Sequence, residues 1–298
     1  MSYADDLVKR LWLHIALFLA ACVTTYLFAG PYFSATLMSI LLCHELGHYI
    51  VGRRRGVPMS LPYFIPLPPG ISLGTMGAVI NMEKPIEDRN SLFDVGAAGP
   101  IAGLVVAIPL LVIGLSMSHV GPSHPDAGTT IEGNSILYAL IKLAMFGQWL
   151  PGGGVDVQLH PMAFAAWVGF LITAINLIPI GQLDGGHIAK ALFGERHEAL
   201  SARLNIALPV LGLVQGAVML VIARDAGADW SDTLSYAQSG AVPWLFWGGL
   251  LYWMRQRAGA YHPPVGDAPL TPGRRRAAIA MLILCALLFI PVPFRPVL

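Results

Sequence analysis

The sequence has few charged residues for its length. Of its 298 residues, 12% are charged and 55% are hydrophobic, and the mean hydropathy is +0.64. Soluble domains carry about a quarter charged residues, so a soluble chain of this composition could not cover its surface with polar groups. The net charge is only +1, which gives no basis for binding nucleic acid. We therefore expect an integral membrane protein surrounded by the lipid bilayer.

Cysteine is scarce as well. The three cysteines, Cys22, Cys43 and Cys285, lie far apart in apolar stretches. This spacing predicts neither a disulfide framework nor a Cys-x-x-Cys metal site. We expect buried free thiols, and any metal site must be built from other side chains.

Long apolar stretches set the architecture, because a spanning helix needs about 20 apolar residues. Seven stretches fit, at residues 11–30, 34–52, 95–118, 161–180, 204–223, 241–254 and 277–291. They predict an all-α polytopic membrane protein with about seven transmembrane helices, in a single membrane-embedded domain over residues 1–298. The first stretch is longer than a signal-peptide core and is followed by a poor cleavage site, so we expect it to be retained.

The lysines and arginines predict the orientation. If the N-terminus is cytoplasmic and each stretch crosses once, 15 of the 18 basic residues lie on the cytoplasmic side. Only Lys142, Arg224 and Arg295 lie on the opposite side. This asymmetry is a positive-inside signal. It predicts an odd number of spans, with the C-terminus outside and residues 119–160 forming an outer loop.

The second apolar stretch contains His44-Glu45-Leu46-Gly47-His48. On a helix, His44 and His48 are one turn apart on one face, so that both imidazoles can bind one zinc ion. Catalytic zinc keeps one position open for water, and Glu45 can accept the proton of that water. Ionisable groups inside a membrane are costly and are functional by default, which makes a chance pattern a poor explanation here.

Elimination indicates the third ligand. The acidic residues within or next to the apolar stretches are Glu45, Asp94 and Asp184. A position at the start of a helix explains Asp94 adequately. Asp184 instead follows Pro179 and Gly181, which interrupt the helix. Irregular backbone at membrane depth is tolerated only inside protein or beside a wet cavity, so Asp184 is the predicted ligand, near the cytoplasmic face with His48.

With these residues identified, the chain resembles the site-2 proteases, which are intramembrane zinc metalloproteases. Their His-Glu-x-x-His, Asn-x-x-Pro and Leu-Asp-Gly motifs match His44–His48, Asn176–Pro179 and Leu183–Gly185. Further segments resemble the plant-chloroplast and cyanobacterial branch: Pro62–Pro66, Gly74–Ala78, Arg89–Asp94, Ala98–Pro100, His160-Pro161, Gly181–His187 and His262–Pro264.

The resemblance implies one zinc per chain, bound by His44, His48 and Asp184, with Glu45 as the catalytic residue. It also implies that Asn176 contacts the substrate, a transmembrane segment of another membrane protein. About ten residues precede the first stretch, and the sequence has no PDZ-like insert or nucleotide-sensing domain. We therefore expect the membrane core or partner proteins to choose the substrate.

Residues 61–82 predict a short membrane-associated β hairpin or sheet. The stretch from Pro62 to Pro69 cannot be a regular helix, and residues 71–82 are too short to span the bilayer. A freed substrate backbone needs hydrogen-bond partners in a dry site, and an enzyme strand can supply them. We expect Gly74 and Gly77 to allow close backbone approach, and Val79 and Ile80 to lie on that strand. Within the outer loop, residues 134–150 predict an interfacial helix, with a shallow lid as the alternative.

Three alternatives remain from the sequence. One is a membrane metalloprotease with a glutamate as third ligand, but no later apolar stretch contains a glutamate. Another is a transporter-like scaffold, which fits a broken helix with an acid but does not explain His44–His48. The last is a catalytically silent homologue, although every required residue is present. Zinc content and cleavage of a transmembrane peptide, with Glu45→Gln as the control, separate these alternatives.

Overall fold

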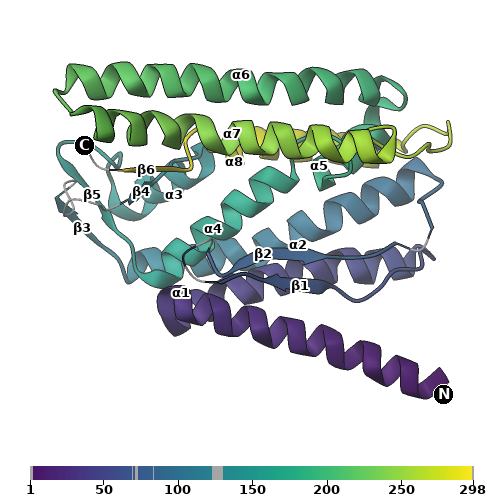
Figure 1. Cartoon of the computed structure of the whole chain (residues 1–298). Coiled ribbons are helices and arrows are strands. Elements are labelled where there is room, and N and C mark those ends of the chain that lie inside the picture. The colour runs from purple at the N-terminus through teal and green to yellow at the C-terminus, as the bar shows by residue number, and fades with distance from the viewer. Residues whose placement is uncertain (1–2, 69, 71–72, 83, 123–129, 297–298) are drawn as a thin grey trace. The chain divides into compact units, whose positions relative to one another are not determined.

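The computed structural model describes residues 3–68, 70, 73–82, 84–122 and 130–296. Its helices are α1 Tyr3–Arg54, α2 Arg89–Ser116, α3 Ile136–Phe146, α4 Pro161–Asn176, α5 Asp184–Phe193, α6 Arg196–Asp225, α7 Trp230–Ala258 and α8 Pro272–Leu288. Its strands are β1 Tyr63–Pro66, β2 Thr75–Val79, β3 His119–Pro122, β4 Thr130–Glu132, β5 Val155–Gln158 and β6 Phe294–Pro296. Figure 1 shows these elements along the chain.

The chain divides into two compact units. The first unit comprises Met1–Glu87, Asp94–His119 and Leu159–Thr173. The second comprises Asp88–Phe93, Val120–Gln158 and Ala174–Leu298. Both α2 and α4 are continuous helices that begin in one unit and end in the other. The single domain expected over residues 1–298 stays a prediction.

In the first unit, α1 is two helices joined at a sharp break. Ala29 and Gly30 have non-helical backbone angles, and Gly30 has φ +81°. Pro31 follows, where it cannot supply the N–H that would continue the helix. Across the break, the Ser34 hydroxyl donates to the Cys22 carbonyl at 2.9 Å. The break separates the two stretches that the sequence predicted at 11–30 and 34–52.

The predicted hairpin is present beside the first half of α1. Strands β1 and β2 pair antiparallel, with Tyr63 opposite Val79 and Phe64 opposite Ala78. Figure 1 shows the hairpin running along α1. The Phe64 side chain is buried against Phe18 of α1, with ring centroids 5.1 Å apart. Part of the predicted segment, residues 69, 71 and 72, lies outside the described residues.

Within the first unit, α2 packs closely on the second half of α1 and on α4. A Cβ on Gly47 would lie 2.6 Å from the Ala98 carbonyl oxygen of α2. A Cβ on Gly114 of α2 would lie 2.4 Å from the Ala163 nitrogen of α4. Both approaches exclude a larger residue. Small residues at such crossings are how membrane helices come close enough to gain dispersion energy.

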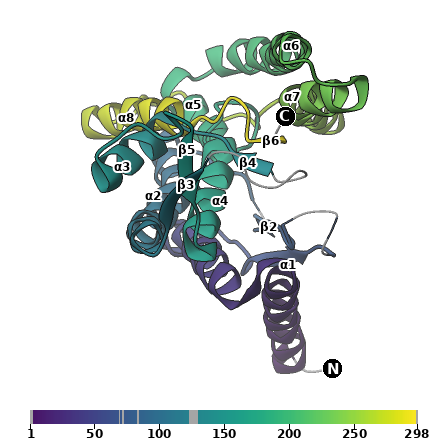
Figure 2. The ribbon, with the colours of Figure 1, turned by 90° about the vertical axis from the view of Figure 1, so that its left-hand side faces the viewer.

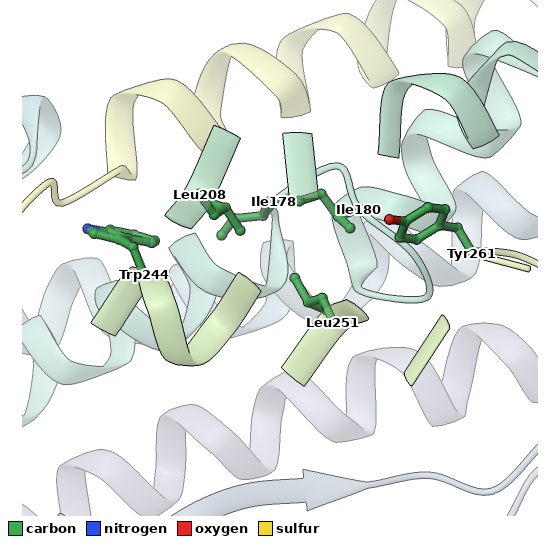
Figure 3. Close-up of a cluster of buried hydrophobic side chains, with 6 residues drawn as sticks. All are labelled: Ile178, Ile180, Leu208, Trp244, Leu251 and Tyr261. Atoms are coloured by element: carbon green, nitrogen blue, oxygen red, sulfur yellow. The ribbon is translucent and has the colours of Figure 1, made fainter. Parts of the chain in front are cut away.

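In the second unit, α6 and α7 run side by side as a long antiparallel pair (Figures 1 and 2). A buried apolar cluster joins this pair to the turn after α4 (Figure 3). Its members are Ile178, Ile180, Leu208, Trp244, Leu251 and Tyr261. The Trp244 indole N–H donates to the Pro291 carbonyl at 2.6 Å, so the one polar atom of its ring is satisfied.

The helices partly match the predicted spans. Three helices of the described chain are long and apolar enough to cross a membrane, at Leu11–Arg54, Arg89–Ser116 and Arg196–Asp225. Seven spans therefore remain a prediction. Residues 134–150 contain α3, which has Ser135 as its N-cap and Gly147 as its C-cap; their interfacial position stays a prediction. Of the predicted outer loop, residues 123–129 lie outside the described residues.

Candidate metal centre

His44 and His48 lie on one face of α1 with their Nε2 atoms 3.1 Å apart. The His48 Nδ1 is 2.8 Å from the carbonyl oxygen of Val95 in α2. Because a carbonyl can only accept, Nδ1 carries the proton and donates it, which leaves the lone pair on Nε2. Such a second contact fixes the tautomer and orientation of a metal-binding histidine.

Two glycines of α2 make room for these rings. A Cβ on Gly99 would lie 2.0 Å from the His48 Nε2. A Cβ on Gly103 would lie 3.3 Å from the His44 Nδ1. The sequence shows this pair as a small-residue motif, which favours helix packing. The same two glycines also let α2 accommodate both imidazole rings. The sequence did not predict that Val95 and Gly99 contact these histidines.

Glu45 and Asp94 occupy different surroundings in the first unit. Glu45 is 8% exposed within the apolar α1, where a carboxylate is costly to bury. Asp94 accepts a hydrogen bond and an ion pair from the Arg55 guanidinium at the end of α1. The expected position of Asp94 at the start of a helix is wrong, because α2 begins at Arg89 and has no acidic residue in its first turn. The Arg55 guanidinium instead gives Asp94 a structural role.

Asp184 is the first residue of α5, in the second unit. Residues 177–183 form a tight turn before it, in which the Ile180 N–H donates to the Ile178 carbonyl at 2.7 Å. A Cβ on Gly185 would lie 1.9 Å from the Leu177 carbonyl oxygen, and one on Gly186 would lie 2.2 Å from that of Gly181. Gly185 and Gly186 are therefore required for α5 to begin against this turn. The Asp184 Oδ2 is buried.

Asn176 is the last residue of α4 and precedes the same turn. The buried cluster of Figure 3 holds the turn in place through Ile178 and Ile180. The backbone N–H of Gly181 adds a hydrogen bond to the Ser201 hydroxyl at 3.3 Å. The second unit thus presents Asn176 and Asp184 at the two ends of one well-anchored turn.

His187, one turn after Asp184 on α5, contacts a histidine that the sequence analysis did not single out. Its Nδ1 is 2.8 Å from the Nε2 of His262, whose own Nδ1 is 2.8 Å from the Pro263 carbonyl oxygen. His262 therefore donates through Nδ1 and accepts from His187 through Nε2. Burial lowers the pKa of His262. The His262-Pro-Pro264 motif is the feature of the sequence that could have drawn attention to His262.

The donor chemistry fits zinc. His44, His48 and Asp184 are a set of side chains that could hold a metal ion, and two imidazoles with one carboxylate suit catalytic zinc. Zinc–nitrogen bonds of about 2.0–2.1 Å in a tetrahedron place two nitrogens roughly 3.3 Å apart, close to the 3.1 Å between the two Nε2 atoms. The two histidines lie in the first unit and Asp184 in the second.

The predicted substrate residues of the hairpin differ in their surroundings. A Cβ on Gly74 would lie 2.7 Å from the Thr25 Cα, and the Thr24 hydroxyl donates to the Gly74 carbonyl at 2.6 Å. The backbone that comes close to Gly74 is thus that of α1. Gly77 has φ +94° and nothing within 4 Å of an added Cβ. Val79 is 55% exposed on β2, and Ile80 follows the end of that strand.

Comparison with known proteins identifies relatives. The model of peptidase family M50 matches residues 32–219. The chain is 34% identical over 185 residues to a protein of Arabidopsis thaliana described as probable zinc metalloprotease EGY1, chloroplastic, covering 59% of this chain and 32% of that protein. It is 29% identical over 218 residues to probable zinc metalloprotease EGY2, chloroplastic, of Oryza sativa subsp. indica, covering 72% and 37%.

The chain spans about a third of the length of these curated relatives. No solved structure gives a significant match. The resemblance to the site-2 proteases is nevertheless confirmed, because the family model covers more than half of the chain and includes His44, His48 and Asp184. The chain belongs to peptidase family M50, the family of the site-2 proteases.

Proposed function

We propose that the chain is an intramembrane zinc metalloendopeptidase that cleaves transmembrane segments of other membrane proteins. The observation that carries the proposal is the pair of imidazoles on an apolar helix, with the two Nε2 atoms 3.1 Å apart and His48 oriented by Val95. Membership of peptidase family M50 supports the reaction class.

In this proposal His44, His48 and Asp184 hold one zinc ion. Zinc, when bound, activates water as a nucleophile and polarises a carbonyl. The Glu45 carboxylate accepts a proton from the attacking water and returns it to the nitrogen of the leaving amine. Burial of Glu45 at 8% exposure keeps this proton transfer away from bulk solvent.

Substrate binding is proposed at strand β2. In the two-stranded sheet, β1 is fixed to α1 by Phe64 and by the His14 ring, whose Nδ1 lies 3.0 Å from the Pro62 carbonyl oxygen. Strand β2 has one edge outside the sheet and exposes Met76 and Val79 at 65% and 55%. An unwound substrate could pair with that edge, with Gly77 leaving room for its backbone. The Asn176 amide can both donate to and accept from the substrate.

The proposed topology has seven spans, a cytoplasmic N-terminus, an outer C-terminus and the active site near the cytoplasmic face. Its support is the distribution of lysines and arginines. Single cysteines at residues 53–60, 190–200 and 258–274 should react with impermeant reagents from the cytoplasmic side. Cysteines at 225–240 should react from the outside. Labelling of residues 190–200 from the outside would contradict the seven-span arrangement.

Cleavage by the purified chain tests the activity. The wild type should cleave a transmembrane peptide, lose that activity on treatment with a zinc chelator, and regain it on addition of Zn²⁺. Glu45→Gln should retain zinc and the fold but lose cleavage by roughly 10²–10⁴-fold or more, as removal of a general base does. Turnover by Glu45→Gln at the wild-type rate would refute the mechanism, and a zinc-free wild type would refute the metal.

A further inference from the structure

A cavity inside the second unit is lined by none of the residues proposed for catalysis. It has a volume of about 500 Å³ and is lined by α6, α7, β4, β6 and the chain around Pro291. Its outer wall is apolar, with Val214, Val218 and Ile222 of α6 exposed at 56%, 52% and 48%. Since α6 is long and apolar enough to span a membrane, lipid can reach this wall directly.

The lining of the cavity includes two hydrogen-bond acceptors with no donor. The Oδ1 of Asn134 and the Oε1 of Gln215 both line the cavity, are buried, and have no hydrogen-bond partner among the described residues. An unpaired buried carbonyl oxygen costs free energy, and in hydrocarbon no water is present to satisfy it. The occupant that suits these oxygens therefore carries N–H or O–H donors.

The same cavity is lined by one carboxylate and one guanidinium. Glu132 ends strand β4, and Arg295 lies on β6, where its partner in the sheet is Ile131. The Lys142 ammonium lies 4.0 Å from the Glu132 carboxylate and 3.5 Å from the Asp156 carboxylate. These charges together balance, which favours a zwitterionic occupant over an anionic one. A guanidinium suits a phosphate diester in particular.

We propose that this cavity binds a membrane phospholipid with a primary ammonium head group, as in phosphatidylethanolamine. The ammonium donates to Asn134, Gln215 and Glu132, the phosphate accepts from Arg295, and an acyl chain lies along Val214 and Val218. A choline head group has no N–H and would leave both amide oxygens unpaired. A phosphoglycerol head group supplies donors but adds a net negative charge beside Glu132.

Native mass spectrometry of the delipidated full chain in detergent tests this assignment. Phosphatidylethanolamine, phosphatidylcholine and phosphatidylglycerol with identical acyl chains are titrated in parallel, together with soluble phosphoethanolamine. We expect the ethanolamine lipid to bind about tenfold more tightly than the choline lipid, which corresponds to about 1.4 kcal/mol. Soluble phosphoethanolamine should not compete at the same concentration, because it lacks the acyl chain.

Variants assign the preference to the named atoms. The double substitution Asn134→Leu and Gln215→Leu should bring the ethanolamine lipid to the affinity of the choline lipid. Arg295→Gln should weaken all three lipids. The matched control is Asn205→Leu, which removes another buried, unpaired amide oxygen of α6 that does not line the cavity, and it should leave the preference intact.

Thermal unfolding checks that each variant is folded. If the double variant unfolds, Val218→Phe, which fills the cavity, should weaken the ethanolamine and choline lipids alike in a folded protein. Equal binding of the two lipids by the wild type would overturn the proposal. So would a preference that survives in the double variant, a preference lost in Asn205→Leu, or full competition by soluble phosphoethanolamine.

Discussion

The two units each bury a group of ionisable side chains, and the groups differ in how their charges are balanced. In the second unit, Lys142 is 0% exposed, and its ammonium lies 3.5 Å from Asp156, 4.0 Å from Glu132 and 4.7 Å from the centre of the Tyr138 ring. In the first unit, His44 and His48 bring two imidazole nitrogens within 3.1 Å of each other. In the Lys142 group the ammonium faces carboxylates of the same group, whereas the histidine pair is an arrangement that a cation stabilises.

The pKa values of Lys142 and Glu132 reflect both burial and this pairing. Burial lowers the pKa of Lys142, and the opposing effect of Asp156 and Glu132 raises it. Burial also raises the pKa of Glu132, while Lys142 lowers it. A buried charge is thus not evidence of a catalytic site by itself. What marks the first unit is a pair of imidazole nitrogens 3.1 Å apart, with the His48 ring oriented by the Val95 carbonyl.

The largest expected effect comes from removing the proposed third metal ligand, Asp184 of the second unit. Asp184→Ala should lower zinc occupancy and reduce cleavage by about 10³-fold or more, because metal activation contributes several kcal/mol. Asp94→Ala is the control, since Asp94 pairs with Arg55, and it should retain both zinc and cleavage. Zinc analysis and peptide cleavage measure the two effects, and equal behaviour of the two variants would exclude Asp184 as the third ligand.

The next largest effect comes from removing the buried cation of the Lys142 group. Lys142→Met leaves two buried carboxylates without their cation and should destabilise the protein by about 3–5 kcal/mol, without altering the zinc content of the folded fraction. The triple change Lys142→Met, Glu132→Gln and Asp156→Asn removes all three charges and should recover most of that loss. Thermal unfolding checks the prediction. Loss of zinc in folded Lys142→Met would show that the two groups are not independent.

The sequence predicted some features well because their causes are local. The separate apolar stretches at 11–30 and 34–52 predicted two helices where α1 breaks, and the spacing of His44 and His48 predicted their common face. The contact of Val95 with His48 could not be predicted, because it depends on how closely α2 packs on α1. Some helices were also predicted to be shorter than they are. Helix α7 begins at Trp230, where the Asp229 carboxylate caps it through the Asp232 N–H, so its polar first turns were missed by a search for apolar residues.

Helix α5 was not predicted for a related reason. It is ten residues long and begins with Asp184-Gly-Gly, a composition that disfavours helix in isolation. Its start against the turn at Leu177 and Gly181 is a tertiary contact that requires exactly those small residues. Likewise β4 and β6 pair residues more than 160 positions apart, and neither strand is long enough to give a periodic signal.

A smaller effect concerns the two strands of the first unit. Proline at Val79 or Ile80 removes one backbone donor of the β2 segment and should slow cleavage of a helical substrate by roughly 10-fold, at about 1–2 kcal/mol for the lost hydrogen bond. A pre-unwound substrate should also be affected, and zinc content should stay unchanged. Cleavage of both substrates at wild-type rates by these variants would remove the hairpin from substrate binding.

The smallest effect compares the two histidine pairs. The His187–His262 pair is closed by donation from His262 to Pro263, and burial lowers the pKa of His262. As the pH falls below about 6.5, the His262 imidazole takes up a proton in the unfolded chain but not in the folded chain. The free energy of unfolding should therefore fall as the pH falls. His262→Gln should make the free energy of unfolding less dependent on pH in this range. Unfolding measured between pH 5 and 8 tests it, and an unchanged slope in His262→Gln would contradict the assignment.

The central claim is that two histidines and one aspartate bind a single zinc ion. X-ray absorption spectroscopy of the purified protein measures this coordination directly. The account predicts one zinc per chain with two imidazole nitrogens and at least one carboxylate oxygen, and a spectrum that changes in Asp184→Asn while the two-imidazole signal remains. A wild-type spectrum that lacks the two-imidazole signal, or one unaffected by Asp184→Asn, would contradict the account.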